Sequence, residues 1–249
     1  MKIVISNTDK ELGELAGKKA ADLIRQAISE KGMANIILAT GTSQFETINQ
    51  LILEQNIDWS KVTMFHLDEY IGMKATHPAS FRKYLTERFL NKVPALKSSF
   101  LISGETDALE ETKRLGKLIN EHPIDVALVG VGENGHLAFN DPPADFETEV
   151  PYLVVDLDEP CRKQQMREGW FATLEEVPKQ AISMSVKQIM KSTSIICSVP
   201  DQRKATAVKD SIEQKISNLF PASVLQEHPD CIFYLDKSSA SLLSLENVS

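Results

Sequence analysis

The chain has 249 residues, 42% of them hydrophobic and 25% charged, which is typical of a globular protein. A formal net charge of −8 and the lack of a basic run argue against a nucleic-acid-binding protein. No apolar stretch reaches the roughly 18 residues of a membrane-spanning helix, so no membrane partner is expected.

Strands and helices are predicted to alternate along the chain. In the first helix, at about 8–30, apolar side chains keep a helical period, and Gly32 is the expected C-cap. Further helices are expected at about 44–54, 78–90, 107–121, 159–171, 204–212 and 222–226. Strands are expected at 2–5, 35–39, 62–67, near 100, and at 124–129, 152–156, 181–184, 194–199 and 231–235. The alternation predicts an α/β fold in one domain, 1–249: a doubly wound, mostly parallel sheet with helices on both faces, similar to a modified Rossmann fold.

The segment Thr40-Gly41-Thr42-Ser43 lies between a predicted strand and a predicted helix. Hydroxyls and free N–H groups at the start of a helix form a pocket for an anion, most naturally phosphate. The alternative is an ordinary N-cap made by Thr42 or Ser43, which is the commoner arrangement for such residues.

Two adjacent carboxylates follow the predicted strand at 62–67, in the sequence His66-Leu67-Asp68-Glu69-Tyr70. Such carboxylates are candidates for proton abstraction. Because side chains alternate in direction along an extended chain, only one of the pair can face a given site, and Asp68 is the closer to the strand. The alternative is a solvated loop start in which Glu69 is a surface charge. His66 is a further residue that could line the site.

A glycine-rich turn, Gly130 to Pro142, follows the apolar strand at 124–129. It places His136 and Asp141 at the carboxyl end of the strand, where ligands bind in open α/β sheets. The turn also contains the pattern G-x-G-x-x-G, which is the dinucleotide-binding fingerprint. The prolines at 142 and 143 leave no room for the long helix that this fingerprint requires, so a dinucleotide role is disfavoured.

In their order along the chain, these motifs resemble the glucosamine-6-phosphate deaminase (isomerase) family, which is related in fold to 6-phosphogluconolactonases. The shared elements are T-G-T-S, L-D-E-Y-I-G with H-P-A-S-F, G-x-G-x-N-G-H-x-A-F-N-D-P, V-P-x-x-A-I-S-M and a Lys-Ala at a helix start, spanning about Ile36 to Leu235. The combination of G-H-x-A-F-N with L-D-E-Y is the specific part of the resemblance.

The resemblance implies a role for individual residues. Asp68 would move a proton between C2 and C1 of the open-chain sugar, and His136 would open the ring together with Asn134 and Asp141. The substrate phosphate would lie in a loop of Gly41, Thr42 and Ser43. It would be held by the cations Arg167 and Lys204, and Arg203 could share that role. The implied activity is the conversion of glucosamine 6-phosphate to fructose 6-phosphate and ammonia.

One departure from the family pattern is Asp141, where the deaminases usually have the longer Glu. This difference leaves galactosamine 6-phosphate open as a substrate. Two further functions stay open, a 6-phosphogluconolactonase and a non-catalytic sugar-phosphate sensor. The acidic segment 144–149 replaces a basic, serine-rich one, so no activation by N-acetylglucosamine 6-phosphate is expected.

The implied chemistry needs neither a redox cofactor nor a metal, and no Cys/His ligand spacing suggests one. The three widely spaced cysteines indicate reduced thiols in the cytoplasm. A homo-oligomer is possible, as in many relatives. Residues 161–171 are expected either to form a mobile lid, with Gly169 as a hinge, or to pack on the sheet edge through Met166, Trp170 and Phe171.

Overall fold

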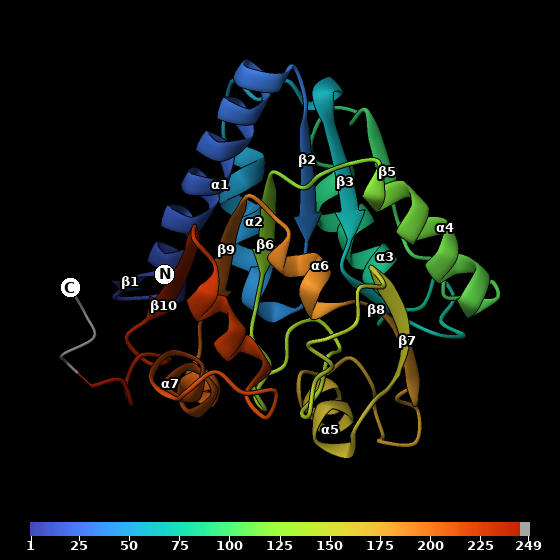
Figure 1. Ribbon diagram of the computed structural model, residues 1–249, viewed down its shortest axis with the longest axis vertical. Coiled ribbons are helices and arrows are strands. Elements are labelled where there is room, and N and C mark those ends of the chain that lie inside the picture. Colours follow the sequence, from blue (N-terminus) through green and yellow to red (C-terminus); the bar gives the residue numbers. More distant parts are fainter. Residues whose placement is uncertain (245–249) are drawn as a thin grey trace.

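The computed structural model describes residues 1–244 and has a central sheet of seven strands (Figure 1). The strand order is β1-β10-β9-β6-β2-β3-β5, and every neighbouring pair is parallel. The bounds of these strands are β1 Lys2–Ser6, β2 Ala34–Leu38, β3 Val62–His66, β5 Ser98–Phe100, β6 Val126–Val129, β9 Ser194–Val199 and β10 Cys231–Asp236. The predicted doubly wound, mostly parallel sheet is confirmed.

Helices cover both faces of this sheet. Their bounds are α1 Asp9–Lys31, α2 Phe45–Leu53, α3 Phe81–Leu85, α4 Ala108–Asn120, α5 Glu159–Arg167, α6 Val186–Met190 and α7 Ala205–Glu213. Short 3-10 turns lie at Thr42–Gln44, Trp59–Lys61, Gln202–Lys204 and Pro221–Glu227, and a π-helical turn lies at Thr86–Leu90. The predicted C-cap is confirmed, because Gly32 is left-handed and its N–H donates to the Ile28 carbonyl.

Strand alternation divides the buried side chains into two main cores. On β2, Ile36 packs in the core under α1 and α2, whereas the next residue, Ile37, packs in the core under α4, α6 and α7. A strand that is buried on both faces usually has a nearly continuous apolar sequence. This applies to β2, because all five of its residues are buried. The two cores thereby hold the sheet rigidly between its helices.

A second, three-stranded antiparallel sheet has the order β4-β8-β7, with β4 Asp68–Tyr70, β7 Tyr152–Asp156 and β8 Gln180–Met184. The strands predicted at 152–156 and 181–184 therefore do not join the main sheet. The sequence pattern could not show this, because strand periodicity does not specify a pairing partner. Only Leu67 separates β4 from β3, and its carbonyl accepts a hydrogen bond from the Met184 N–H, 2.9 Å away, which joins the small sheet to the large one.

Two predicted helices have other bounds in the structure, and one helix was not predicted. The helix expected at 78–90 begins only after Ser80, whose hydroxyl caps the Lys83 N–H, and it continues as a π-helical turn. The helix expected at 159–171 ends at Arg167, shortly before Gly169, which is left-handed (φ 85°). The short α6, capped by Ser185, was not predicted because one turn and a half is too short for a visible period.

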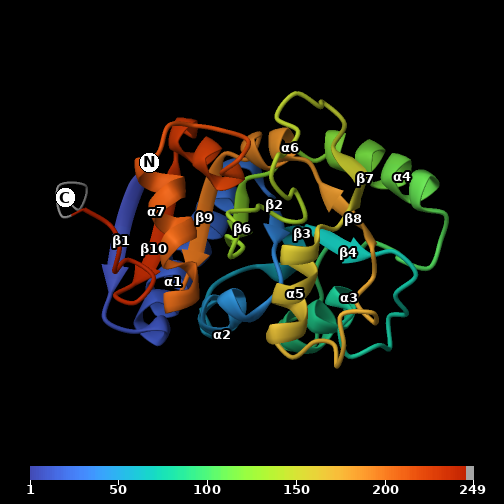
Figure 2. The same cartoon turned by 90° about the horizontal axis from the view of Figure 1, so that it is seen from below.

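The carboxyl ends of β2, β3, β6 and β9 lie at the same edge of the main sheet. Figure 2 views the molecule from this edge, with α5 beside β4, where the Tyr70 hydroxyl of β4 donates a hydrogen bond to Gln165 of α5. The strand order reverses at β6, because β2 continues toward β3 while β9 continues toward β10. Ligands bind at such a switch point in open α/β sheets, so the topology marks this edge as the place for a site.

Candidate active site

A cavity opens at the carboxyl edge, and four strand ends, together with α5, supply its walls. Most of its polar lining comes from residues that the sequence motifs contain. These are Gly41, Thr42, Ser43, Asp68, His136 and Lys204. The structure therefore brings together residues that lie up to 163 positions apart in the chain.

Asp68 lies at the start of β4, lines the cavity and is 7% exposed. Burial raises the pKa of its carboxyl to about 8, and the neighbouring Glu69 carboxylate adds to the rise. A carboxyl with a pKa near neutrality can both take up and return a proton, which is what a general base in an isomerisation must do.

Glu69 is fully buried and points away from the cavity. Its carboxylate accepts hydrogen bonds from the Ser80 hydroxyl (2.8 Å) and from the N–H groups of Tyr70 (3.0 Å), Phe81 (3.3 Å) and Arg82 (2.9 Å). The Arg82 guanidinium lies 3.5 Å away. The interpretation of Glu69 as a surface charge is therefore wrong: this carboxylate holds the first turn of α3 against β4.

The glycines after β6 make room for neighbouring side chains. A Cβ atom on Gly132 would lie 2.3 Å from the imidazole of His136, and one on Gly130 would lie 2.7 Å from the Ser43 hydroxyl. The space that a dinucleotide fingerprint leaves for a pyrophosphate is thus occupied by an imidazole and a hydroxyl. No helix follows before α5, which agrees with the prediction against a dinucleotide site.

His136 is held from behind by Asp141. The Nδ1 atom of the imidazole lies 3.0 Å from Oδ1 of Asp141, and both side chains are more than nine-tenths buried. Asn134 donates a hydrogen bond to Asp141 Oδ1 (3.0 Å), and its own carbonyl oxygen accepts the backbone N–H of His136 (3.2 Å). Burial acts to raise the pKa of Asp141, but the contacts with His136 and Asn134 outweigh it and the pKa is lowered. An ionised Asp141 can orient the imidazole and stabilise its protonated form.

The loop at the end of β2 leads into α2 without a side-chain cap. Neither Thr42 nor Ser43 makes a capping hydrogen bond, and both line the cavity. The interpretation of these residues as an ordinary N-cap is therefore wrong. Lys204, the last residue of the 3-10 turn before α7, lines the same cavity and is 5% exposed, and burial lowers the pKa of its amine. Two hydroxyls and a buried cation thus face one space.

Arg167 lies outside the cavity lining, in contrast to Lys204. Its guanidinium pairs with the Glu133 carboxylate, which also lies 3.7 Å from Arg203. Arg203 is paired more closely with Asp201 (2.6 Å). Both arginines therefore stand at the rim of the site, held by carboxylates.

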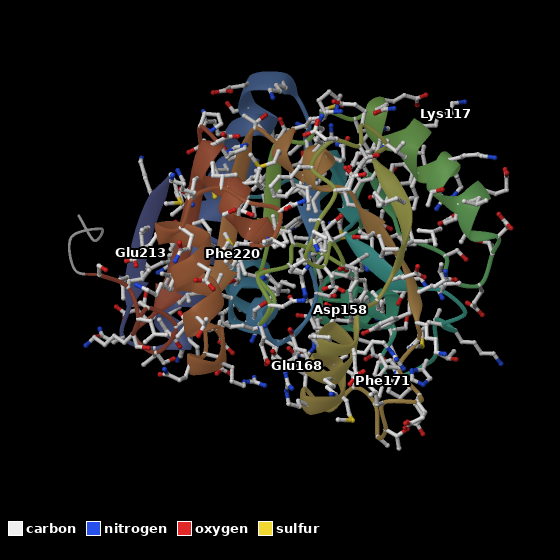
Figure 3. All side chains as sticks on the ribbon, turned by 60° about the horizontal axis from the view of Figure 1, so that its bottom comes forward. Lys117, Asp158, Glu168, Phe171, Glu213 and Phe220 are labelled. Atoms are coloured by element: carbon white, nitrogen blue, oxygen red, sulfur yellow. The ribbon has the colours of Figure 1, made fainter. Side chains whose placement is uncertain are left out.

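Three polar residues of α5 and its C-cap also line the cavity, although no sequence motif marked them: Gln164, Gln165 and Glu168. Gln164 accepts a hydrogen bond from the Glu133 N–H (2.9 Å), and Gln165 accepts one from the Tyr70 hydroxyl (2.9 Å). A signal is present in the sequence, since the segment is polar and rich in Gln, but the pattern does not show which side of the helix faces the site. Figure 3 labels Glu168 at the C-cap of α5 and Asp158 at its N-cap.

The packing expected for the end of this segment is present. Phe171 is 7% exposed and lies against the Tyr70 ring, with ring centroids 5.5 Å apart. His66, by contrast, does not line the cavity. It is fully buried behind the site, its Nδ1 accepts the Ile102 N–H (3.4 Å), and burial lowers its pKa to about 3.

Comparison with known proteins agrees with this geometry. Residues 7–233 match the family model for glucosamine-6-phosphate isomerases and 6-phosphogluconolactonase. The chain belongs to this family. Glucosamine-6-phosphate deaminase of Listeria monocytogenes is 39% identical over 232 residues, which cover 92% of this chain and 97% of the relative. The deaminase of Streptococcus pneumoniae is 36% identical over 228 residues, covering 91% and 94%.

Solved structures give the same result for the fold. A monomeric glucosamine-6-phosphate deaminase superimposes with a TM-score of 0.90 at 34% identity, covering 98% of this chain and all of the relative. A 6-phosphogluconolactonase of Neisseria gonorrhoeae superimposes with a TM-score of 0.76 at 21% identity, covering 95% and 99%, and shares the fold. Within residues 1–244, no helix combines the length and apolar character that a membrane crossing requires.

Proposed function

We propose that this protein is a glucosamine-6-phosphate deaminase, which converts glucosamine 6-phosphate and water to fructose 6-phosphate and ammonia. The observation that carries the proposal is that Asp68 and His136 line one cavity together with Thr42, Ser43 and Lys204. An acid/base pair and an anion-binding group in the same cavity match a substrate that carries both reacting carbons and a phosphate.

The phosphate would bind first, to the loop of Gly41, Thr42 and Ser43 and to the Lys204 amine. Hydroxyls and N–H groups at the start of a helix stabilise an anion, and a buried ammonium strengthens the site. Arg167 would complete the site by turning from Glu133 to the phosphate, since a dianion competes well with one carboxylate. Binding this remote group orients the sugar carbons toward Asp68.

Ring opening would follow, with His136 moving the proton between the ring oxygen and the C1 hydroxyl. Asp141 keeps the imidazole oriented and stabilises its charged form, and Asn134 fixes the carboxylate in turn. Although Asp141 is shorter than the usual Glu, it reaches His136 at 3.0 Å. It lies outside the cavity lining, so the shorter side chain does not itself favour galactosamine 6-phosphate.

Asp68 would then take the proton from C2 and return it to C1. A second proton passes from the amine nitrogen to O1, so the C1 aldehyde becomes a hydroxyl and the amine-bearing C2 becomes an imine. Water adds to that carbon and ammonia leaves, which yields the ketose. Each step uses proton transfers that a carboxylate and an imidazole can perform.

The proposal is tested by mixing the protein with glucosamine 6-phosphate and measuring ammonia and fructose 6-phosphate in equal amounts. Asp68→Asn should remove turnover while phosphate affinity stays nearly unchanged. Faster turnover of galactosamine 6-phosphate would reassign the substrate, and hydrolysis of 6-phosphogluconolactone alone would make the protein a lactonase. Tight binding without turnover of any hexosamine phosphate would make it a sensor.

We further propose that residues 1–249 act as one cytoplasmic domain, supported by the contribution of both sheets to the cavity and by three buried, unpaired cysteines. The family resemblance leaves a homo-oligomer open, and this stays a prediction. One solved relative is described as monomeric. Light scattering of the purified protein decides between a monomer and an oligomer, because the monomer has a mass of 27.7 kDa.

A further inference from the structure

Three potential metal ligands meet behind the cavity. They are Nδ1 of His136, a carboxylate oxygen of Asp141 and the Sγ of Cys161, and all three atoms lie within 4.8 Å of one another. His136 and Asp141 come from the glycine-rich turn, whereas Cys161 comes from the first turn of α5, where its N–H donates to Asp158 Oδ1 (2.6 Å). The first two side chains belong to the proposed active site, but Cys161 has no place in the proposed reaction.

The imidazole nitrogen in this cluster faces the Asp141 carboxylate. His136 Nδ1 is buried and makes no hydrogen bond of good geometry, although Asp141 Oδ1 lies 3.0 Å away. Cys161 is 1% exposed and lies beside the carboxylates of Asp141 and Asp158. An imidazole, a thiol and two acidic groups surround this buried space, and the acidic groups make it favourable for a cation.

The donor set selects a class of metal. One imidazole, one thiolate and one carboxylate suit Zn²⁺ and its analogues Co²⁺ and Cd²⁺, whereas Mg²⁺ and Ca²⁺ prefer oxygen ligands only. A tetrahedral zinc ion with bonds of about 2.0–2.3 Å sets its ligand atoms roughly 3.5 Å apart, so small side-chain rotations suffice here. The fourth position would hold a water molecule.

We propose that His136, Asp141 and Cys161 form a zinc-class metal site that inhibits the enzyme. On binding, the Cys161 thiol releases its proton to solvent and the imidazole proton shifts from Nδ1 to Nε2; the thiolate, Nδ1 and the carboxylate then each donate an electron pair to the metal. The loss of activity rests on the proposed function, because an imidazole held by a metal through Nδ1 cannot become the cation that ring opening requires. The binding itself does not depend on that function.

Cobalt titration of the whole protein tests the site directly. Co²⁺ bound to a thiolate gives a near-ultraviolet charge-transfer band, so the wild-type protein should show this band at one equivalent, with release of a proton. Cys161→Ser and Cys161→Ala should each abolish the band and weaken binding by at least the roughly 10–100-fold that losing an outer partner of a metal site costs. Circular dichroism of both variants confirms that they are folded.

The matched controls are Cys197→Ser and Cys231→Ser, which remove the other two buried thiols from β9 and β10. Both should keep the band. A band that survives in both Cys161 variants, or its absence in the wild-type protein, overturns the proposal.

A second measurement separates the metal site from the function. Zn²⁺ should inhibit deamination by the wild-type protein and by both control variants. It should inhibit Cys161→Ser much less, and the turnover of this variant without added metal should stay near the wild-type value. A band without any deamination would retain the metal site and reject the proposed function. Equal inhibition of the wild-type protein and Cys161→Ser would reject the inhibitory role.

Discussion

Asp68 and Glu69 are adjacent in the chain, yet their carboxylates point to opposite sides of β4. Asp68 faces the cavity, while Glu69 is enclosed by the first turn of α3 and accepts hydrogen bonds from four donors. The buried charge of Glu69 contributes to the raised pKa of Asp68. The pair therefore connects the packing of one short helix to the proton affinity of the proposed base.

Glu69→Gln should shift the pH profile of the enzyme to lower pH. The rate should follow the ionised form of Asp68, so kcat/KM of the wild-type protein should rise with pH through about 8. Removing the negative charge of Glu69 lowers the pKa of Asp68, and the rise should then occur at a lower pH. The pH dependence of kcat/KM measures this directly, and an unchanged profile would reject the coupling.

The matched control is Glu105→Gln, which removes a half-exposed carboxylate 3.1 Å from the far side of Arg82. Its pH profile should stay close to that of the wild-type protein. Glu69→Gln should also lower the free energy of unfolding by about 1–3 kcal/mol, because an amide cannot accept from all the N–H groups that the carboxylate accepts. Comparing the two variants separates the electrostatic effect from a general loss of packing.

Asp68→Asn should stabilise the protein while abolishing turnover. The pKa of Asp68 is about 8 in the folded protein and near its usual 3.8 in the unfolded chain. The folded state therefore binds the extra proton between these values, and stability falls as pH rises through that window. One unit of pKa shift corresponds to about 1.4 kcal/mol, so replacing the carboxyl by a neutral amide should raise the free energy of unfolding by a few kcal/mol at pH 8.

The gain from Asp68→Asn should shrink nearly to zero toward pH 4, close to the unfolded-state pKa of 3.8, because below that pKa the carboxyl is protonated in both states. Denaturant unfolding at the two pH values checks this dependence. Asp156→Asn, on the exposed side of β7, should change stability little at either pH. A gain that is the same at pH 4 and pH 8 would contradict the buried-charge explanation.

Gly132→Ala should damage catalysis without removing phosphate binding. The new Cβ would lie 2.3 Å from the His136 ring and must displace it, and a shift of about 1 Å in a catalytic group can cost 100-fold in rate. Gly116→Ala is the control, since its Cβ meets Pro151 at an ordinary 3.7 Å in α4. We expect a fall in kcat for the first variant only, measured by ammonia release.

Lys204→Met should weaken substrate binding more than it slows turnover. A charge-assisted hydrogen bond to phosphate contributes about 1.5–3 kcal/mol, which corresponds to a rise in KM of roughly 10–100-fold. Competitive inhibition by inorganic phosphate should weaken by a similar factor. Lys191→Met, which removes an exposed ion pair with Glu149, should leave both constants near the wild-type values. Equal phosphate inhibition of the wild-type protein and Lys204→Met would refute the assignment.

N-acetylglucosamine 6-phosphate should not activate the enzyme. Segment 144–149 is acidic, and its carboxylates Glu147 and Glu149 already pair with Lys187 on α6. The segment contains no Lys or Arg that could bind a phosphate effector, and its acidic groups repel one. Initial rates measured with and without the effector, at substrate concentrations below KM, check the expectation; a clear rise in rate would reject it.

Local physics explains why much of the fold could be predicted from the sequence. Helix α1 carries its own period and cap, and the strands buried on both faces are short apolar runs between turns. The second sheet could not be predicted, because the pairing of β4 with β8 joins residues more than 110 positions apart. The burial of Glu69 was missed because its hydrogen-bond donors lie mainly at the start of the next helix, and no local pattern shows how that helix packs on β4.

The sequence by itself determined the α/β alternation, the family and the residues of the proposed chemistry, because these depend on local periodicity and on contiguous motifs such as G-H-x-A-F-N. Only the tertiary structure decided which side chains share a space. It placed Lys204 in the cavity and Arg167 at the rim, and it brought Cys161 to within reach of His136 and Asp141. Ligand spacing along the chain could not reveal that cluster, because packing of α5 against the glycine-rich turn, rather than local geometry, creates it.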